Sequence, residues 1–306
     1  MQIDTAIRKY ARHQKSMNRA DATIQWYNTL LHRFSRFAQS RGINNISGIN
    51  SQLLLSYQFN ISQSPNSHSH PYSVAVQNLH IIVIRCLYRH LIKAGIINHD
   101  PTIDIELARV PDTLPSDILT IAEMFTLLNQ PDTTICGIRD RCMMELLYST
   151  GMRRMEILGL NINDIYVDTA SIFIRRAKGE KNRVVPFGSM AKKYLRMYLP
   201  SRFELLTKES GEAVFLGNDG RRMNKQMLGR LIHFYAQKAG IFKNMTPHLF
   251  RHTCATHLLN NGASILHIQK LLGHSRVETT TRYLRISIES LKKVHSEFHP
   301  REMMTL

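Results

Sequence analysis

The chain has 306 residues, and its 40 Lys and Arg against 23 Asp and Glu give a formal net charge of +17. That length predicts two domains, and such an excess of positive charge fits a polyanionic partner such as duplex DNA. No apolar run of about 18 residues and no N-terminal signal peptide is recognised, so we expect a soluble cytoplasmic protein without membrane contact.

The N-terminal part of the chain, residues 1–108, predicts a small all-helical domain. Apolar residues keep helical spacing over residues 23–38, 53–61 and 74–94. In the last of these helices the predicted core positions are Val76, Leu79, Ile82, Val83, Cys86, Leu87 and Leu91. Three side chains near the core positions of the first helix are expected to face solvent or DNA: Trp26, Arg33 and Arg36.

Prolines mark a linker over residues 109–116, because proline disfavours a helix in the residues before it. Thr120 and Glu123 then form a capping box, the pattern that opens a helix. A second domain is therefore expected over residues 117–306.

The first half of this second domain contains two segments with basic residues at defined positions. Residues 147–157 place Arg153 and Glu156 shortly after a glycine. Residues 172–176 and 183–186 predict two strands, and the turn between them contains Lys178 followed by glycine. Each feature is common when it stands alone.

A helix is predicted from Thr246, which caps it, and Pro247, its first residue, to about Asn260. His248 and Arg251 lie three residues apart and are expected on one face, directed at the same point. The opposite, buried stripe is predicted to consist of Phe250, Cys254 and Leu258.

A second helix is expected over residues 265–272, where Gly273 would end it and present His274. Ser275 and Glu278 then form a capping box that opens the helix carrying Tyr283. The segment therefore places a histidine and a tyrosine in order after the helix that carries Arg251.

In this order, the motifs resemble the signature of the tyrosine recombinases, the family of the phage-type integrases and the Xer proteins. The resemblance covers nearly all of the second part of the chain. It implies a mainly α protein with a small β-sheet: a helical, SAM-like core-binding domain followed by a mixed α+β catalytic domain. It also implies the catalytic residues Arg153, Lys178, His248, Arg251, His274 and Tyr283, with Glu156 orienting their neighbours.

The implied reaction replaces a DNA phosphodiester by a 3′-phosphotyrosyl diester and later reseals a strand, with no metal, cofactor or ATP. Arg153 and Arg251 would bind the phosphorane oxygens on which negative charge develops. The phenol of Tyr283, with an ordinary pKa of about 10, needs a base, for which His248 is positioned. Lys178 would protonate the leaving 5′ oxygen, and His274 would bind the scissile phosphate.

The expected partner is double-stranded DNA with specific recombination sites, met at the bacterial nucleoid. The resemblance implies a tetramer on DNA, held by a C-terminal tail that docks into the next protomer, and a second recombinase is a further candidate partner. The apolar residues of this tail are Ile286, Ile288, Leu291 and Val294.

Three alternatives differ from this interpretation. A non-cleaving DNA-binding accessory or regulatory protein on the same fold would not need Tyr283. A metal-dependent nuclease would need clustered carboxylates, where the motifs offer Arg, Lys and His. A serine hydrolase would need a Gly-x-Ser-x-Gly turn, which is not found.

Four cysteines without paired metal-ligand spacing are predicted to be reduced core residues: Cys86, Cys136, Cys142 and Cys254.

Overall fold

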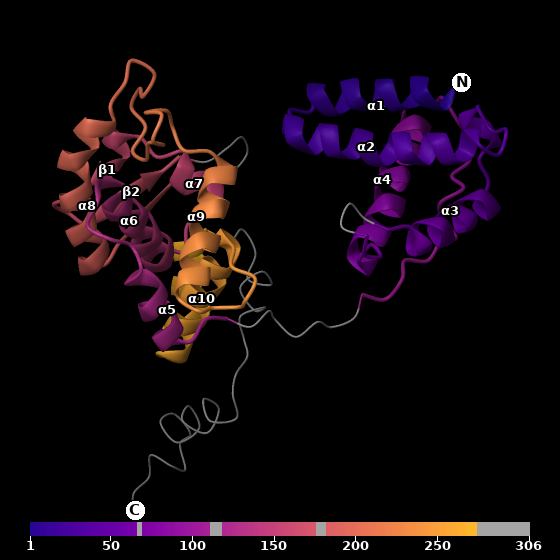
Figure 1. Cartoon of the computed structure of the whole chain (residues 1–306). Helices are drawn as coiled ribbons and strands as arrows, with labels where there is room; N and C mark the ends of the chain where they lie inside the picture. The colour runs from indigo at the N-terminus through magenta and orange to yellow at the C-terminus, as the bar shows by residue number, and fades with distance from the viewer. Residues whose placement is uncertain (66–68, 111–117, 176–181, 274–306) are drawn as a thin grey trace, which may run out of the picture. The chain divides into compact units, whose positions relative to one another are not determined.

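The computed structural model describes residues 1–65, 69–110, 118–175 and 182–273 (Figure 1). The chain divides into two compact units, residues 1–113 and 114–306. The described part is mainly helical and contains one three-stranded antiparallel sheet, which confirms the predicted fold class. No helix in these residues combines the length and the apolar character that a membrane span requires.

The described residues of the first unit form four helices and a short 3-10 turn. They are α1 (Ile3–Ser16), α2 (Asp21–Gln39), the turn Ile46–Gly48, α3 (Ser51–Gln63) and α4 (Val74–Lys93). The sequence predicted α2, α3 and α4, whereas α1 was missed although Ile3, Ala6, Ile7 and Tyr10 have helical spacing and are buried. Helices α1 and α2 pack side by side (Figure 1).

The buried stripe of α4 differs from the predicted one. Ile82, expected in the core, is 37% exposed, whereas Ile81, Ile84 and Tyr88 are buried. The sequence of α4 is apolar on several sides, so its spacing allows more than one stripe. Packing against α1, α2 and α3 selects the stripe that is buried.

The side chains predicted to face solvent or DNA have different surroundings. Trp26 is 52% exposed and Arg36 is also exposed on α2. Arg33 is half-buried, and its Nη1 donates to the hydroxyl of Tyr72 at 2.7 Å. Only Trp26 and Arg36 therefore match the expectation fully.

The second unit begins with α5, whose start confirms the predicted capping box. The Thr120 backbone N–H donates to Glu123 Oε2 at 2.7 Å, and the Glu123 N–H donates to Thr120 Oγ1 at 3.1 Å. The helices of this unit are α5 (Ile121–Leu128), α6 (Ile135–Thr150), α7 (Arg154–Leu158), α8 (Ser189–Ser201), α9 (Lys225–Lys238), α10 (Pro247–Asn260) and α11 (Ile265–Leu272). The described residues of this unit also contain two 3-10 turns, Ile162–Asp164 and Arg202–Leu205. The bounds predicted for α10 and α11 are confirmed.

The sheet has the strand order β1-β2-β3, with β1 (Ile165–Tyr166), β2 (Ser171–Ile174) and β3 (Arg183–Pro186). The predicted pair β2 and β3 is confirmed, and β1 was missed because two residues give no periodic signal. Ile172 pairs with Val185, and both are buried. The face that carries them packs into the core of the unit.

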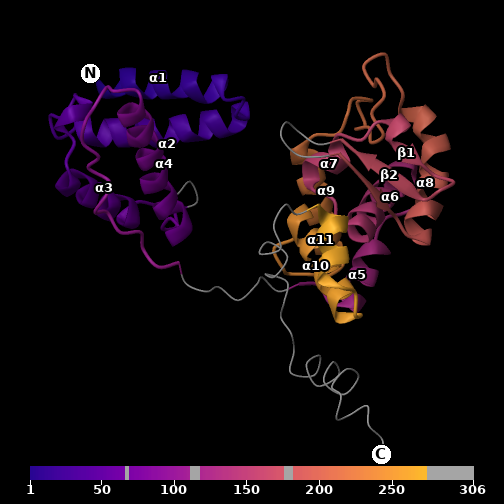
Figure 2. The same ribbon diagram turned by 180° about the vertical axis from the view of Figure 1, so that it is seen from behind.

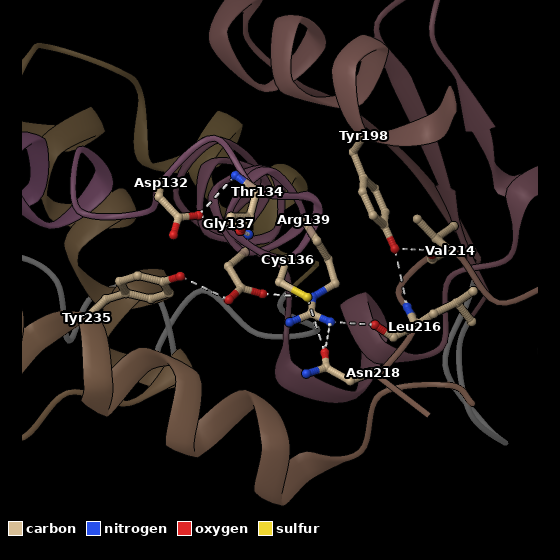
Figure 3. Close-up of polar contacts among 11 residues, drawn as sticks. Asp132, Thr134, Cys136, Gly137, Arg139, Tyr198, Val214, Leu216, Asn218 and Tyr235 are labelled. Carbon is tan, nitrogen blue, oxygen red and sulfur yellow. Dashed lines mark hydrogen bonds and ion pairs between the residues drawn. The ribbon is translucent and has the colours of Figure 1, made fainter. Parts of the chain in front are cut away.

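Helix α6 lies inside the second unit and buries charged residues there (Figure 3). Arg139 Nε donates to Asp140 Oδ1 at 2.8 Å, and Arg139 Nη1 donates to the carbonyl of Leu216 at 2.9 Å and to Asn218 Oδ1 at 3.1 Å. The hydroxyl of Tyr235 on α9 donates to Asp140 Oδ2 at 3.1 Å. These bonds offset the cost of burying both charges and connect α6 with α9 and with the 216–218 segment.

The four cysteines are free thiols, as predicted. Cys142 and Cys254 are buried, and Cys86 and Cys136 are half-buried, so two of the four only partly fit the predicted core position. Burial raises the pKa of the Cys254 thiol to about 12, which keeps it protonated.

Candidate active site

The turn between α6 and α7 positions Arg153. Gly151 ends α6 with φ of 58°, in the left-handed region that favours glycine. A Cβ atom on Gly151 would lie 2.5 Å from Leu272 Cδ2, so a larger residue would displace the Leu272 side chain as well as strain the backbone. Two residues later, Arg153 is the N-cap of α7.

Glu156, in the first turn of α7, orients Arg153. Its Oε2 accepts from the Arg153 backbone N–H at 2.8 Å, and its Oε1 accepts from Arg153 Nη1 at 3.1 Å. The Glu156 side chain is only 9% exposed, whereas that of Arg153 is 37% exposed. The carboxylate therefore supports Arg153 from inside the protein.

Arg183 also binds Glu156, and the sequence analysis did not single it out. Its Nη1 and Nη2 donate to Glu156 Oε1 and Oε2 at 2.7 and 2.9 Å, a bidentate pair. The sequence spacing indicates that Arg183 is partly buried, because it lies two residues from the buried Val185 and shares one face of β3 with it. An arginine on a buried strand face needs a carboxylate partner.

The pKa of Glu156 lies below its usual value. Burial by itself would raise the pKa of this carboxyl group. The hydrogen bonds from Arg183 and from the Arg153 backbone, together with the two positive charges, outweigh burial. Glu156 is therefore an anion at neutral pH.

Arg251 on α10 is almost fully buried, with 2% exposure. Its Nη1 donates to the carbonyl of Gly151 at 2.7 Å and its Nη2 to the carbonyl of Leu272 at 2.9 Å. These oxygens lie at the C-terminal ends of α6 and α11, where helix dipoles place partial negative charge. The guanidinium therefore holds three helices together at one point.

His248 lies in the first turn of α10, one turn before Arg251, and is exposed. Its pKa is lowered, first by partial shielding from water and then by the charges of Arg251 and Arg153. Both guanidiniums therefore lie near enough to disfavour imidazolium. The structure brings together His248, Arg251 and Arg153, and the imidazole is neutral at neutral pH.

The predicted stripe of α10 is only partly correct. Phe250 and Cys254 are buried and Leu258 is half-buried, but Thr253, Thr256 and His257 on other faces are buried too. Helix α10 is therefore buried on most of its sides between Phe250 and Leu258. It lies beside α11 and packs against α6 (Figure 2).

Lys178, His274 and Tyr283, three of the predicted catalytic residues, lie outside the described residues. Leu271 and Leu272, which precede His274 and Tyr283 in the sequence, lie close to the site. The carbonyl of Leu272 accepts from Arg251 Nη2, and that of Leu271 accepts from Arg183 Nε at 3.2 Å. Within the described part of the chain, no cluster of His, Cys, Asp and Glu is placed to hold a metal ion.

Comparison with known proteins shows the family. Residues 117–289 match the model of the phage integrase family. Tyrosine recombinase XerD of Staphylococcus epidermidis is 34% identical over 305 residues, covering 98% of this chain and 100% of the relative. Tyrosine recombinase XerC 2 of Ralstonia nicotianae is 33% identical over 283 residues, covering 92% of this chain and 81% of that protein.

Among solved structures, the Tn1549 transposon integrase in complex with transposon right-end DNA has the same fold. The TM-score is 0.78 at 19% identity, covering 97% of this chain and 99% of the integrase chain. The family model and the relatives agree on the family, and the solved structure agrees on the fold. The chain belongs to the phage integrase family, the tyrosine recombinases.

Proposed function

We propose that this protein is a site-specific DNA recombinase that cuts and rejoins strands through a 3′-phosphotyrosyl intermediate on Tyr283. The observation that carries the proposal is the gathering of Arg153, Arg251 and His248 around the ends of α6 and α11 in a member of this family. Three basic groups on separate elements form a site for one anionic group.

The two arginines are suited to the charge that develops during phosphodiester cleavage. Attack on phosphorus builds negative charge on the phosphorane oxygens, and guanidinium groups stabilise it most where water is excluded. Arg251 is buried and fixed by carbonyl oxygens, and Arg153 is fixed by Glu156. Little reorganisation is then needed when the charge appears, and no metal is required.

His248 is suited to remove the phenolic proton, because its lowered pKa keeps the imidazole neutral. In the proposed step the Tyr283 oxygen bonds to phosphorus, its proton passes to His248 and the bond to the 5′ oxygen breaks. Lys178 gives a proton to that oxygen, and His274 binds the phosphate. One diester replaces another, so a 5′ hydroxyl reseals the strand without ATP.

The DNA duplex is proposed to contact both units, residues 1–108 as the core-binding domain and 117–306 as the catalytic domain. The net charge of +17 supports such a partner, and exposed Trp26 and Arg36 on α2 are suited to contact it. We further propose a tetramer on paired sites at the bacterial nucleoid in the cytoplasm, alone or with a second recombinase.

The proposal is tested on a duplex selected from a random library by binding to the full chain. Arg153→Gln should lower the single-turnover cleavage rate by at least about 10²-fold, as for loss of one transition-state donor. Duplex binding should fall much less, because many basic residues share it. Arg221→Gln, which removes one exposed charge paired with Glu209, is the control and should cleave normally.

Equal losses of binding and of cleavage in Arg153→Gln would place Arg153 in general phosphate contact and contradict the proposal. Cleavage should also persist in excess chelator, and a strict magnesium requirement would favour a nuclease instead.

A further inference from the structure

Arg183 is the first residue of β3, and its guanidinium donates hydrogen bonds to Glu156 and to the carbonyl of Leu271. Its side chain is 10% exposed, its two terminal nitrogens hold both oxygens of Glu156, and its Nε donates to the Leu271 carbonyl. The positive charge of this guanidinium is therefore balanced by a carboxylate within the protein, whereas the acceptors named for Arg251 are neutral carbonyls. The role of Arg183 therefore follows from the groups that it binds, the Glu156 carboxylate and the Leu271 carbonyl.

Glu156 is shared between two arginines. Each of its oxygens accepts one bond from Arg183 and one from Arg153. Arg183 makes the shorter side-chain hydrogen bonds to the Glu156 carboxylate, 2.7 and 2.9 Å, while the Arg153 side chain donates to this carboxylate at 3.1 Å. The carboxylate charge is thus largely balanced by Arg183, and Arg153 is held without a bidentate pair.

Arg183 also reaches the end of α11. The carbonyls of Leu271 and Leu272 accept from Arg183 and Arg251 respectively. Adjacent carbonyls in the last turn of α11 are therefore fixed by two different guanidiniums. Arg183 on β3 is therefore hydrogen-bonded to both α7 and α11. In the sequence, Arg183 comes five residues after Lys178, and α11 ends directly before Gly273.

We propose that Arg183 is a positioning residue for the strand-cleavage reaction. It neutralises Glu156 so that Arg153 keeps its guanidinium directed at the phosphate, and it fixes the end of α11 from which the chain continues to His274 and Tyr283. Without Arg183, the buried Glu156 anion draws Arg153 into a bidentate pair and competes with the phosphate for it. This inference rests on the proposed function.

The decisive comparison is a double-mutant cycle in the full-length protein. Arg183→Gln should lower single-turnover cleavage about 10- to 100-fold, by analogy with the loss of a residue that orients a metal ligand. Arg183→Gln combined with Glu156→Gln should cleave faster than Arg183→Gln alone, because the competing anion is then gone. Arg183→Lys should be intermediate, since it keeps the charge and loses the bidentate geometry.

A purely structural role also allows rescue of stability in the double variant, because removing both partners of a buried ion pair costs less than removing one. It differs in predicting equal cleavage rates for all variants when cleavage is measured well below the melting temperature of each. If the double variant is no faster than Arg183→Gln, the neutralising role is wrong. Arg221→Gln is the matched control for the lost charge, and thermal unfolding of every variant separates folding from rate.

A crystal structure of Arg183→Gln tests the same inference without DNA chemistry. The expected result is a bidentate pair between Arg153 and Glu156, and an unmoved Arg153 side chain would overturn the proposal. If the unmodified protein forms no covalent adduct with DNA, the proposed function fails, while this structure still decides the role of Arg183.

Discussion

Arg251 shows how a single side chain sets the geometry of this site. It is 2% exposed and donates to the carbonyls of Gly151 and Leu272, which end two different helices. A buried charge that loses such partners is destabilising, so substitutions of Arg251 affect folding as well as chemistry. Arg153, with its side chain 37% exposed, is the cleaner residue for testing catalysis.

The pKa of His248 provides a prediction that needs no DNA. Shielding from water and the charges of Arg251 and Arg153 lower this pKa, so NMR titration should give a value below the ordinary one of about 6.5. Arg153→Gln removes one nearby charge and should raise it, whereas Arg221→Gln should not. A His248 pKa at or above about 6.5 in the unmodified protein would contradict the proximity of the guanidiniums.

Gly151 provides a second prediction at this scale. Gly151→Ala adds a Cβ 2.5 Å from Leu272 Cδ2 and also strains a φ of 58°. Gly240→Ala is the matched control, since Gly240 has φ of 68° with nothing near its missing Cβ. Thermal unfolding should show a cost of roughly 1–2 kcal/mol for the control, from backbone strain alone, and clearly more for Gly151→Ala. Equal costs would mean that Leu272 moves aside freely.

Part of this residue-scale picture could be predicted from the sequence. Arg153, Glu156, His248 and Arg251 were identified because short motifs place them, and the structure brings them together. Arg183 was missed because its partner lies 27 residues away, and sequence spacing does not show which carboxylate meets a buried strand residue. The burial of Arg251 was missed for the same reason, since its acceptors are main-chain carbonyls of distant residues.

At the scale of elements, helix α10 connects the site to the start of the second unit. The hydroxyl of Tyr148 on α6 lies 2.8 Å from His257 Nδ1, and His257 Nε2 lies 2.9 Å from the Leu119 carbonyl. A carbonyl only accepts, so Nε2 carries the proton and Nδ1 accepts from the tyrosine. Burial lowers the pKa of His257, which agrees with a neutral ring.

This connection predicts the effect of Tyr148→Phe. The variant leaves the His257 Nδ1 acceptor without its tyrosine donor, which should lower the free energy of unfolding by about 1–3 kcal/mol in denaturant titration at neutral pH. Because the folded-state pKa of His257 is lowered, the unfolded chain binds a proton first as the pH falls below about 6.5. The stability from this group is therefore present above that pH and is lost below it. No change in stability in the variant would mean that the hydrogen bond contributes nothing.

Sequence periodicity succeeded for some elements and failed for others. The caps at Thr120 and Thr246 and the glycine stops gave correct helix bounds, because capping is local chemistry. The face pattern of α10 was only partly right, since its buried polar residues are satisfied by distant partners such as Tyr148. Helices α8 and α9 were not predicted, although their hydrophobic residues are spaced for burial.

At the scale of the whole molecule, the proposed tetramer on DNA depends on contacts between separate protomers. The apolar tail residues Ile286, Ile288, Leu291 and Val294 lie outside the described residues, so the docking of this tail stays a prediction from the sequence. Deleting residues from Ser290 onward should leave binding to a single DNA site nearly intact and abolish or unbalance strand exchange on paired sites. A mobility-shift assay measures binding to a single site, and a recombination assay measures strand exchange on paired sites. Normal recombination by the truncated chain would exclude the tail as the coupling element.

In the proposed reaction, Tyr283 becomes covalently joined to a DNA 3′ phosphate. The direct measurement uses a nicked suicide duplex containing the selected binding site, followed by denaturing electrophoresis and peptide mapping by mass spectrometry. The account predicts a covalent adduct that maps to Tyr283, forms in excess chelator without ATP, and is absent in Tyr283→Phe with DNA binding retained. An adduct that persists in Tyr283→Phe, or maps to another residue, would contradict it.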